Sequence, residues 1–206
     1  MVSPMLRLIL LAGSVSGLWS FEQARAGRPA EGFEVVGTLP PAPRWVVERD
    51  GGQQVLAQTE ATPEDKIGRH SFALVEGGVY GDVALQARIK LLSEGGQAGL
   101  VFRYLDRDNH YLLTLDARQR KIRLVRVVNG NRVSIHGEDD VDLETGVWYQ
   151  LKLRLEGPAI AARMNGLRLF KAQDRSLPER GRIGFFCDDH TRAHFDDLEV
   201  AGIEKH

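Results

Sequence analysis

The alternation of apolar and polar residues along the chain predicts strands. Residues 99–132 contain three short apolar runs, at 100–105, 111–115 and 122–128, and polar turns separate them. Each run is rich in Val, Leu, Phe and Tyr and roughly alternates, which is typical of strands and not of helices. We therefore expect a three-stranded meander, around which the rest of the chain is organised.

The same alternation continues on both sides of this meander. In residues 82–92 every second residue from Val83 to Leu91 is apolar, which indicates an antiparallel strand with one buried face. Residues 147–155 alternate in the same way, and their polar face consists of Trp148, Gln150, Lys152 and Arg154. Several predicted strands thus leave one side for solvent or a ligand.

Turn signals separate the predicted strands at short intervals. The pair Asn165-Gly166 is the strongest hairpin signal, and residues 129–131 (Asn-Gly-Asn) and 50–52 (Asp-Gly-Gly) suit the positive φ angles of tight turns. No segment offers a helical stripe of ten residues or more. About a dozen short strands with regular turns predict an all-β protein, and we favour a two-sheet antiparallel β-sandwich of the jelly-roll type.

The N-terminus has the pattern of a secretory signal. Residues 1–7 carry a positive charge, residues 8–19 form an apolar run too short to span a bilayer comfortably, and residues 24–26 read Ala-Arg-Ala. We predict that residues 1–26 are removed on export to the periplasm or the extracellular space. Residues 27–206 then form a single β-sandwich domain, without a membrane span. The alternative is a retained N-terminal anchor.

Composition narrows the function classes further. The 27 basic and 28 acidic residues of this 206-residue chain nearly cancel, so no global field attracts nucleic acid, and we expect no nucleic-acid partner. Cys187 is the single cysteine, which excludes an intramolecular disulfide. Because it ends an apolar run, we interpret it as a small buried hydrophobic residue and not as a nucleophile.

Several motifs resemble the concanavalin A-like lectin/glucanase superfamily. They include GLVFRY at 99–104 with DRDNHY at 106–111, LVRVVNG at 124–130, GVWYQL at 146–151, GRIGF at 181–185 and AHFDDLEV at 193–200. The chain is most similar to the exported laminin-G-like jelly rolls and to the 3-keto-disaccharide hydrolase domain. The resemblance spans residues 33–203 and implies a concanavalin A-like sandwich. Such families include carbohydrate-binding modules, lectins and glycosidases, so the fold alone does not define the activity.

An acidic segment imitates the catalytic motif of the endoglucanases in this superfamily. Their Glu-x-Asp-x-Glu strand supplies a nucleophile and a general acid for a retaining mechanism. Here Asp140, Asp142 and Glu144 reproduce the spacing, but an Asp stands in the nucleophile position. The resemblance also places a connecting loop at this point. We therefore interpret the segment as a solvated acidic loop and predict no catalytic residue.

A structural calcium site is a second hypothesis. Related sandwiches hold Ca²⁺ between the chain ends, and the resemblance places Asp196 in the matching position, with Glu31 or Glu34 as the N-terminal ligand. Carboxylates suit this hard cation. The alternatives are that these carboxylates are turn or capping residues, or that His190 and His194 bind zinc without a third ligand at the expected spacing.

The third hypothesis is a sugar-binding face. A sugar ring stacks on an aromatic side chain, and charged or amide groups bind its hydroxyls. Trp148, with Lys152 further along the same face, offers that pairing, and Arg103, Asn109 and Tyr111 are candidate contacts from the meander. The alternative is that Trp148 packs over a loop and that the arginines are ordinary exposed strand residues.

From these observations we expect an exported, non-catalytic carbohydrate-binding or cell-surface interaction module, with a glycan as its partner. An alternative is a glycoside hydrolase acting on a (3-keto-)disaccharide or a glucan. A third possibility is a structural envelope domain that binds protein. The position of Trp148 relative to the sheets, and any pair of carboxylates in one cleft, would discriminate between these functions.

Overall fold

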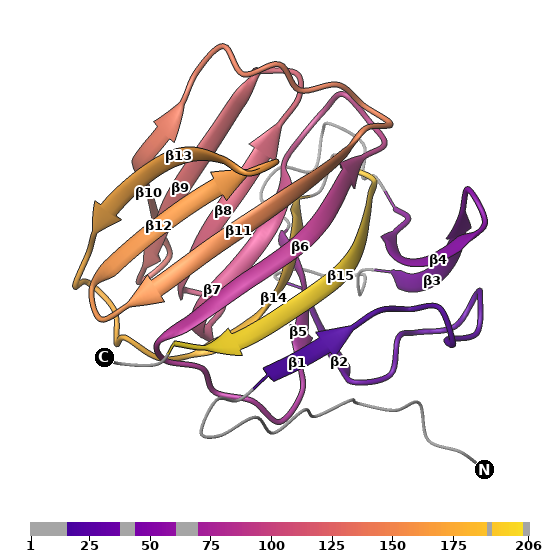
Figure 1. Ribbon diagram of the computed structural model, residues 1–206, viewed down its shortest axis with the longest axis horizontal. Coiled ribbons are helices and arrows are strands. Elements are labelled where there is room, and N and C mark those ends of the chain that lie inside the picture. Colours follow the sequence, from indigo (N-terminus) through magenta and orange to yellow (C-terminus); the bar gives the residue numbers. More distant parts are fainter. Residues whose placement is uncertain (1–15, 38–43, 61–69, 189–190, 204–206) are drawn as a thin grey trace.

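The computed structural model describes residues 16–37, 44–60, 70–188 and 191–203. Within these ranges the chain forms two antiparallel sheets that pack face to face, and it contains no helix (Figure 1). The predicted fold class, an all-β two-sheet sandwich, is confirmed. In this part of the chain there is accordingly no helix that is long and apolar enough to cross a membrane.

The larger sheet has eight strands, and seven of them follow the order β13-β12-β11-β6-β15-β4-β3. The remaining strand, β1, pairs with the C-terminal half of β15, beside the short pairing of β15 with β4. The strands are β1 (Ser16–Trp19), β3 (Trp45–Asp50), β4 (Gln53–Gln58), β6 (Val83–Leu91), β11 (Trp148–Glu156), β12 (Ala159–Met164), β13 (Leu167–Gln173) and β15 (Ala193–Gly202).

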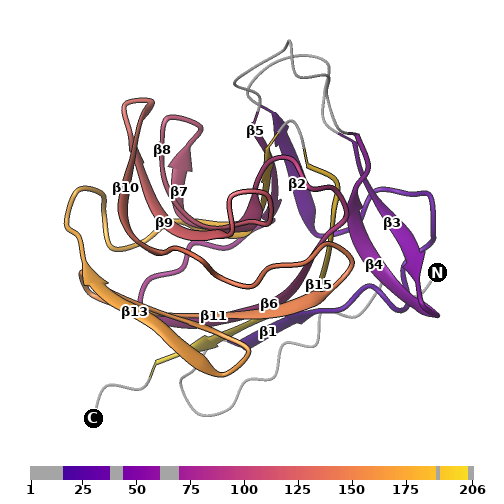
Figure 2. The same cartoon turned by 90° about the horizontal axis from the view of Figure 1, so that it is seen from above.

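The second sheet has seven strands in the order β10-β9-β8-β7-β14-β5-β2. It curves like a trough, with β10 on one wall and β5 and β2 on the other (Figure 2). The strands are β2 (Phe33–Gly37), β5 (His70–Val75), β7 (Ala98–Asp106), β8 (Asn109–Asp116), β9 (Lys121–Val128), β10 (Asn131–Glu138) and β14 (Arg182–Asp188).

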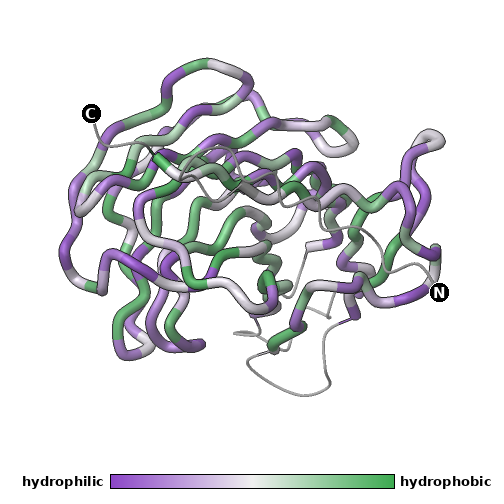
Figure 3. Tube along the Cα trace, turned by 60° about the horizontal axis from the view of Figure 1, so that its bottom comes forward, coloured by the Kyte–Doolittle hydropathy of each residue, from purple (hydrophilic) through white to green (hydrophobic). Residues whose placement is uncertain are grey.

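The main hydrophobic core lies between the two sheets. Along most of β6 and β11 every second side chain is buried. Hydrophilic and hydrophobic residues accordingly alternate over short stretches of the chain (Figure 3). Leu85 and Ile89 of β6 belong to the same hydrophobic cluster as Leu113 and Phe185 from the facing sheet. Period-two alternation therefore directs one face of each strand inward and leaves the other outside.

A smaller apolar cluster fills the trough of the seven-stranded sheet. Its members include Phe72, Leu112 and Phe186, none of which is exposed. The rings of Phe72 and His110 lie 5.1 Å apart, although two strands separate β5 from β8. In a flat sheet strands three positions apart are about 14 Å from one another. The curvature thus folds this outer face onto itself.

The predicted meander and hairpins are present. Residues 99–132 contribute β7, β8, β9 and the start of β10. Asn165 (φ 48°) and Gly166 (φ 82°) form the turn between β12 and β13, and Asn129 (φ 48°) and Gly130 (φ 75°) form the turn between β9 and β10. Positive φ at both central residues is the geometry that tight hairpins require.

Residues 16–26 contribute to the sandwich. β1 lies within the predicted signal, and Phe21 is only 4% exposed in the main core, where its ring is 5.7 Å from that of Phe33. Removal of residues 1–26 would delete both features. Cleavage after Ala26, and a domain over residues 27–206, stay predictions. Residues 33–37 form β2.

Candidate functional site

The polar face of β11 lies on the outside of the eight-stranded sheet. Trp148 and Gln150 are half-buried there, and Lys152 and Arg154 are exposed. Side chains on one face of a strand recur about every 6.8 Å, so this line is about 20 Å long. The alternation that buries Leu151 and Leu153 places these four polar residues together. Trp148 and Lys152, both predicted ligand contacts, share this surface.

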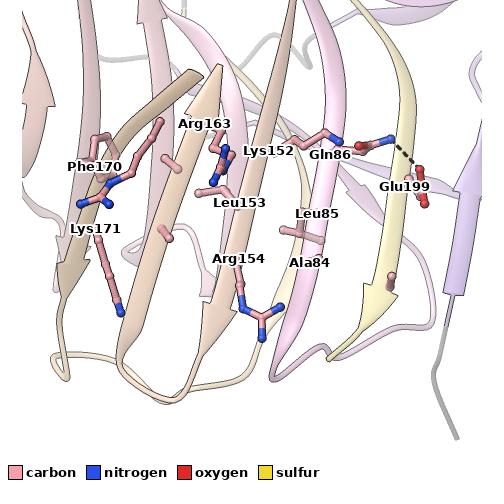
Figure 4. Close-up of a pocket in the computed structure, with 14 residues that line it drawn as sticks. Ala84, Leu85, Gln86, Lys152, Leu153, Arg154, Arg163, Phe170, Lys171 and Glu199 are labelled. Carbon is pink, nitrogen blue, oxygen red and sulfur yellow. Dashed lines mark hydrogen bonds between the residues drawn. The ribbon is translucent and has the colours of Figure 1, made fainter. Parts of the chain in front are cut away.

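An open cavity of about 390 Å³ adjoins Lys152 on this surface. Three small residues, Ala84, Ala161 and Ala201, line it and leave room above the backbone. Long polar side chains from five neighbouring strands surround them (Figure 4). These residues are Gln86 (β6), Lys152 and Arg154 (β11), Arg163 (β12), Arg168 and Lys171 (β13) and Glu199 (β15).

The cations at this cavity differ in their pairing. Arg154 lies 3.2 Å from the carboxylate of Glu156, and Arg163 donates a 3.0 Å hydrogen bond to the carbonyl of Gly166. The side chains of Lys152, Arg168 and Lys171 have no hydrogen-bond or ion-pair partner among the described residues and are exposed. Across the cavity, Gln86 donates to Glu199 at 2.6 Å (Figure 4).

Trp148 stands at the other end of the same face, among paired charges. The guanidinium of Arg88 and the ammonium of Lys90 each lie 5.0 Å from the centre of its ring, within cation–π range. Arg88 also contacts Asp196 at 2.6 Å, and Lys90 pairs with Asp50. The indole therefore packs on two cations, which agrees with the structural alternative for Trp148 and leaves part of the ring exposed.

The predicted calcium ligands have different environments. Asp196 is 1% exposed and bonded to Arg88, and burial raises the pKa of its carboxyl to about 6. Glu31 is exposed in the turn before β2. Over the ranges that the structure covers, no three His, Cys, Asp or Glu side chains are grouped to hold a metal. Calcium binding by Asp196 and Glu31 stays a prediction, and the zinc hypothesis involves His190, which lies outside the described residues.

Arg103 and Tyr111 lie between the sheets and not beside Trp148. Arg103 is 1% exposed, lies 5.9 Å from the centre of the Tyr111 ring and donates to the carbonyl of Gly157, in the turn between β11 and β12 of the facing sheet. The Tyr111 hydroxyl donates to Asp174 at 2.5 Å. Burial disfavours the ionised form of Asp174, but this bond and others from Ser176 and Arg126 lower its pKa overall. These contacts connect the two layers.

Asn109 is occupied at the turn between β7 and β8. Its side-chain amide donates to Asp106, and its carbonyl oxygen accepts a 3.1 Å hydrogen bond from the N–H of Asn129. Of the five predicted ligand contacts, only Trp148 and Lys152 therefore share a surface. Ligand contact by Arg103, Asn109 and Tyr111 stays a prediction.

Two histidines lie in the trough of the seven-stranded sheet. His110 is fully buried, and its Nδ1 lies 3.2 Å from the carbonyl of Asp106, to which the neutral ring donates. Arg132 reaches over the Phe186 ring and contacts His70 at 3.2 Å. Burial lowers the pKa of both imidazoles to about 4. The trough is thus a neutral aromatic cluster that Arg132 covers.

The acidic segment is a loop, as the sequence indicated. Asp140, Asp142 and Glu144 lie between β10 and β11 and on no strand. Glu199 is the single carboxylate that lines the described cavity. A retaining or inverting mechanism needs two carboxyl groups on either side of one bond. The cavity does not provide this pair within the described residues.

The cationic side chains of β12 and β13 are functional candidates that the sequence interpretation missed. The hairpin turn at Asn165 and Gly166 pairs Arg163 with Arg168, and β12 in turn pairs Arg163 with Lys152. The first pairing was accessible from the sequence, because a two-residue turn sets the register of its hairpin. The second depends on which strand lies beside β12.

In sequence comparisons, no protein family and no curated protein matches the chain. Solved structures share its fold. One is the carbohydrate-binding module CBM66 from Bacillus subtilis, with 18% identity and a TM-score of 0.65 over 85% of this chain and 98% of the module. A prokaryotic β-1,3-1,4-glucanase (lichenase) from a mouse hindgut metagenome has 12% identity and a TM-score of 0.58 over 91% and 98%.

A third similar structure is the exoplasmic/lumenal domain of VIP36 in its Ca²⁺/Man3GlcNAc-bound form. It has 10% identity and a TM-score of 0.61 over 85% of each chain. All three are sandwiches of the jelly-roll type, so the predicted concanavalin A-like fold is confirmed. At these identities the likeness concerns the fold, and the activity has to be argued from the residues of this chain.

Proposed function

We propose that this protein is an exported, non-catalytic carbohydrate-binding module that uses the outer face of its eight-stranded sheet. The observation that carries the proposal is the open cavity beside Lys152, with small apolar side chains within it and hydrogen-bonding side chains around it. A sugar presents apolar C–H faces and many hydroxyls, which match these two features. Pockets of 300–1,000 Å³ are typical of small-ligand sites.

Export and calcium belong to this proposal. The N-terminal sequence supports export, and carbohydrate-binding relatives in fold are compatible with an extracellular setting. The VIP36 structure contains Ca²⁺, but in this chain Arg88 already pairs with Asp196. Any calcium bound there must displace that guanidinium. Thermal unfolding in about 5–10 mM CaCl₂, compared with unfolding in EDTA, tests this part, because weak extracellular calcium sites have dissociation constants of about 0.1–1 mM.

The experiment is a binding screen of the purified chain against immobilised neutral and acidic polysaccharides. Lys152→Ala should weaken retention by the bound polysaccharide, because the ammonium lines the cavity. Arg49→Ala is the matched control, since Arg49 is also an exposed strand cation but lies on β3, at the far edge of the same sheet. Absence of binding to every polysaccharide would overturn the proposal.

The hydrolase alternative predicts a different outcome. A catalytic module would release reducing ends from a bound glucan or disaccharide, and mutation of a cavity carboxylate would abolish that release. Glu199→Gln tests the one carboxylate that lines the cavity. Reducing-sugar release that this substitution abolishes would favour the enzyme over the binding module.

A further inference from the structure

We propose that the cavity on the eight-stranded sheet selects glycans that carry carboxylate groups. This inference rests on the proposed function, and it names the chemical class of the ligand. The feature behind it is a row of three cations, Lys152, Arg163 and Arg168, one on each of three neighbouring strands. We call these three residues the cationic row.

The members of the cationic row lie directly opposite one another. In the register of the sheet Lys152 pairs with Arg163, and Arg163 pairs with Arg168. Opposite residues on one face of an antiparallel pair have Cβ atoms about 4.5–5.5 Å apart, where like charges are destabilising. All three side chains line the cavity, so the repulsion is concentrated at the candidate ligand site. An anion that binds there relieves it.

The other half of the same sheet face shows how this protein neutralises cations elsewhere. Arg88 has two acidic partners, Asp196 at 2.6 Å and Asp197 at 2.8 Å, and Lys90 pairs with Asp50. No acidic side chain pairs with a member of the cationic row within the described ranges. The unneutralised charge is therefore a local property of the cavity and not of the whole face.

The chemistry of the cavity favours a carboxylated glycan over other polyanions. Two guanidinium groups are suited to planar carboxylates, which they bind through paired N–H donors. Glu199 and Gln86 on the β6–β15 side offer an acceptor and an amide for hydroxyls. The carboxylate of Glu199 would repel a continuous phosphate backbone laid across the cavity. A chain with both carboxylates and free hydroxyls satisfies both sides.

The test compares two polymers with the same backbone. Carboxymethyl cellulose carries carboxylates and hydroxyethyl cellulose does not, so native affinity electrophoresis in gels of each polymer isolates the contribution of charge. The test variant is Lys152→Gln with Arg168→Gln. The control variant, Arg49→Gln with Arg107→Gln, changes the net charge equally but alters exposed cations on β3 and on the turn after β7. Thermal unfolding verifies that all variants are folded.

We expect the unchanged protein to bind carboxymethyl cellulose at least about tenfold more tightly than hydroxyethyl cellulose at 50 mM salt. This ratio is expected because one charged contact typically changes affinity by about one order of magnitude. The test variant should lose most of this preference and the control variant should keep it. The preference for carboxymethyl cellulose should also weaken at 0.5 M salt, because a tenfold rise in salt shortens the Debye length by roughly threefold and screens the charges.

Three results would overturn the inference. The first is equal binding of the two celluloses, which leaves the proposed function intact because a sugar still binds. The second is an equal loss of preference in the test and control variants. The third is tighter binding of single-stranded DNA or dextran sulfate than of carboxymethyl cellulose. Binding to no polysaccharide at all would remove both the inference and the proposed function.

Discussion

Removal of the repulsion along the cationic row is expected to stabilise the fold. The perturbation is Lys152→Gln with Arg168→Gln, which leaves Arg163 as the single charge of the row and preserves its hydrogen bond to Gly166. Neither altered side chain has a partner among the described residues, so no favourable contact there is lost. Most surface substitutions change stability by less than about 0.5 kcal/mol, so a clear gain is diagnostic.

The magnitude follows from the register. Two directly opposite like-charge pairs disappear, and a cross-strand pair contributes roughly 0.2–1 kcal/mol. In water, two unit charges about 6–8 Å apart repel by about 0.5–0.7 kcal/mol, which agrees with that range. The free energy of unfolding should therefore rise by about 1 kcal/mol. For a chain of this size the Tm should rise by about 2–4 °C.

Urea unfolding at two salt concentrations is the assay. The gain should be present at 0.1 M NaCl and largely absent at 1 M, because the Debye length falls from about 10 Å to about 3 Å. The control variant, Arg49→Gln with Arg107→Gln, should show no gain. A test variant less stable than the unchanged protein would refute the reasoning. So would a gain that persists unchanged at 1 M salt, since it would then arise from strand propensity.

Three further predictions concern the scaffold. Burial lowers the pKa of His70 and His110 to about 4, so the stability that their neutral forms provide is complete above pH 6.5 and is lost as the pH falls through 4. Urea unfolding between pH 7.5 and 4 should show a loss of up to about 3 kcal/mol per histidine. The substitution His110→Phe should flatten this pH dependence. Arg103→Ala should lower the free energy of unfolding in urea by about 2–4 kcal/mol, because it deletes a buried side chain that joins the sheets. It should leave glycan affinity unchanged; reduced affinity would instead support the predicted ligand contact. A chain that begins after Ala26 should have a lower Tm than one that begins at residue 16, because it lacks Phe21 and β1. An equal Tm would contradict the structural role of residues 16–26, and mass spectrometry of the mature protein will show which chain is made.

The fold could be predicted from the sequence because its signals are local. Strict alternation in residues 83–91 and 148–156 determines which face of each strand is buried, and the structure buries those faces. The Asn-Gly pair at 165–166 determines the turn and the first two pairs of the hairpin, Met164 with Leu167 and Arg163 with Arg168, after which the register shifts by one residue. Each of these features depends on residues that are close in the chain, so no knowledge of the rest of the sandwich is required.

The environment of Arg103 could not be predicted in this way. Alternation along β7, with Leu100 and Phe102 facing the core, places residue 103 on the outer face. Arg103 instead has a positive φ of 47°, at a point where the register of β7 shifts. An irregularity of this kind inserts residues and reverses the face of those that follow. The arginine consequently points into the space between the sheets, where its side chain is fully buried.

The cationic row could be predicted only in part, for a related reason. The hairpin register gives the pair Arg163 and Arg168, but the third member depends on the position of β12 beside β11. The cavity also depends on Ala201, which lies far away in the sequence and is brought beside Ala84 by the pairing of β15 with β6. Sites assembled from several strands are set by strand order, which short-range patterns do not specify.

The difference between the two outer faces explains why the ligand surface is assigned to the eight-stranded sheet. In the trough of the seven-stranded sheet Phe72, His110 and Phe186 are fully buried against one another. A ligand that enters there has to displace aromatic side chains, each of which buries about 150–250 Å² and contributes about 4–6 kcal/mol at 25 cal/mol per Å². The face that carries Lys152 imposes no such cost, because alanines leave its cavity open and its cations already face solvent. In the open cavity of the free protein the cations repel one another, so an anionic ligand that relieves this repulsion binds more tightly. In the filled trough the packed aromatic side chains already stabilise the fold, and a ligand would have to displace them.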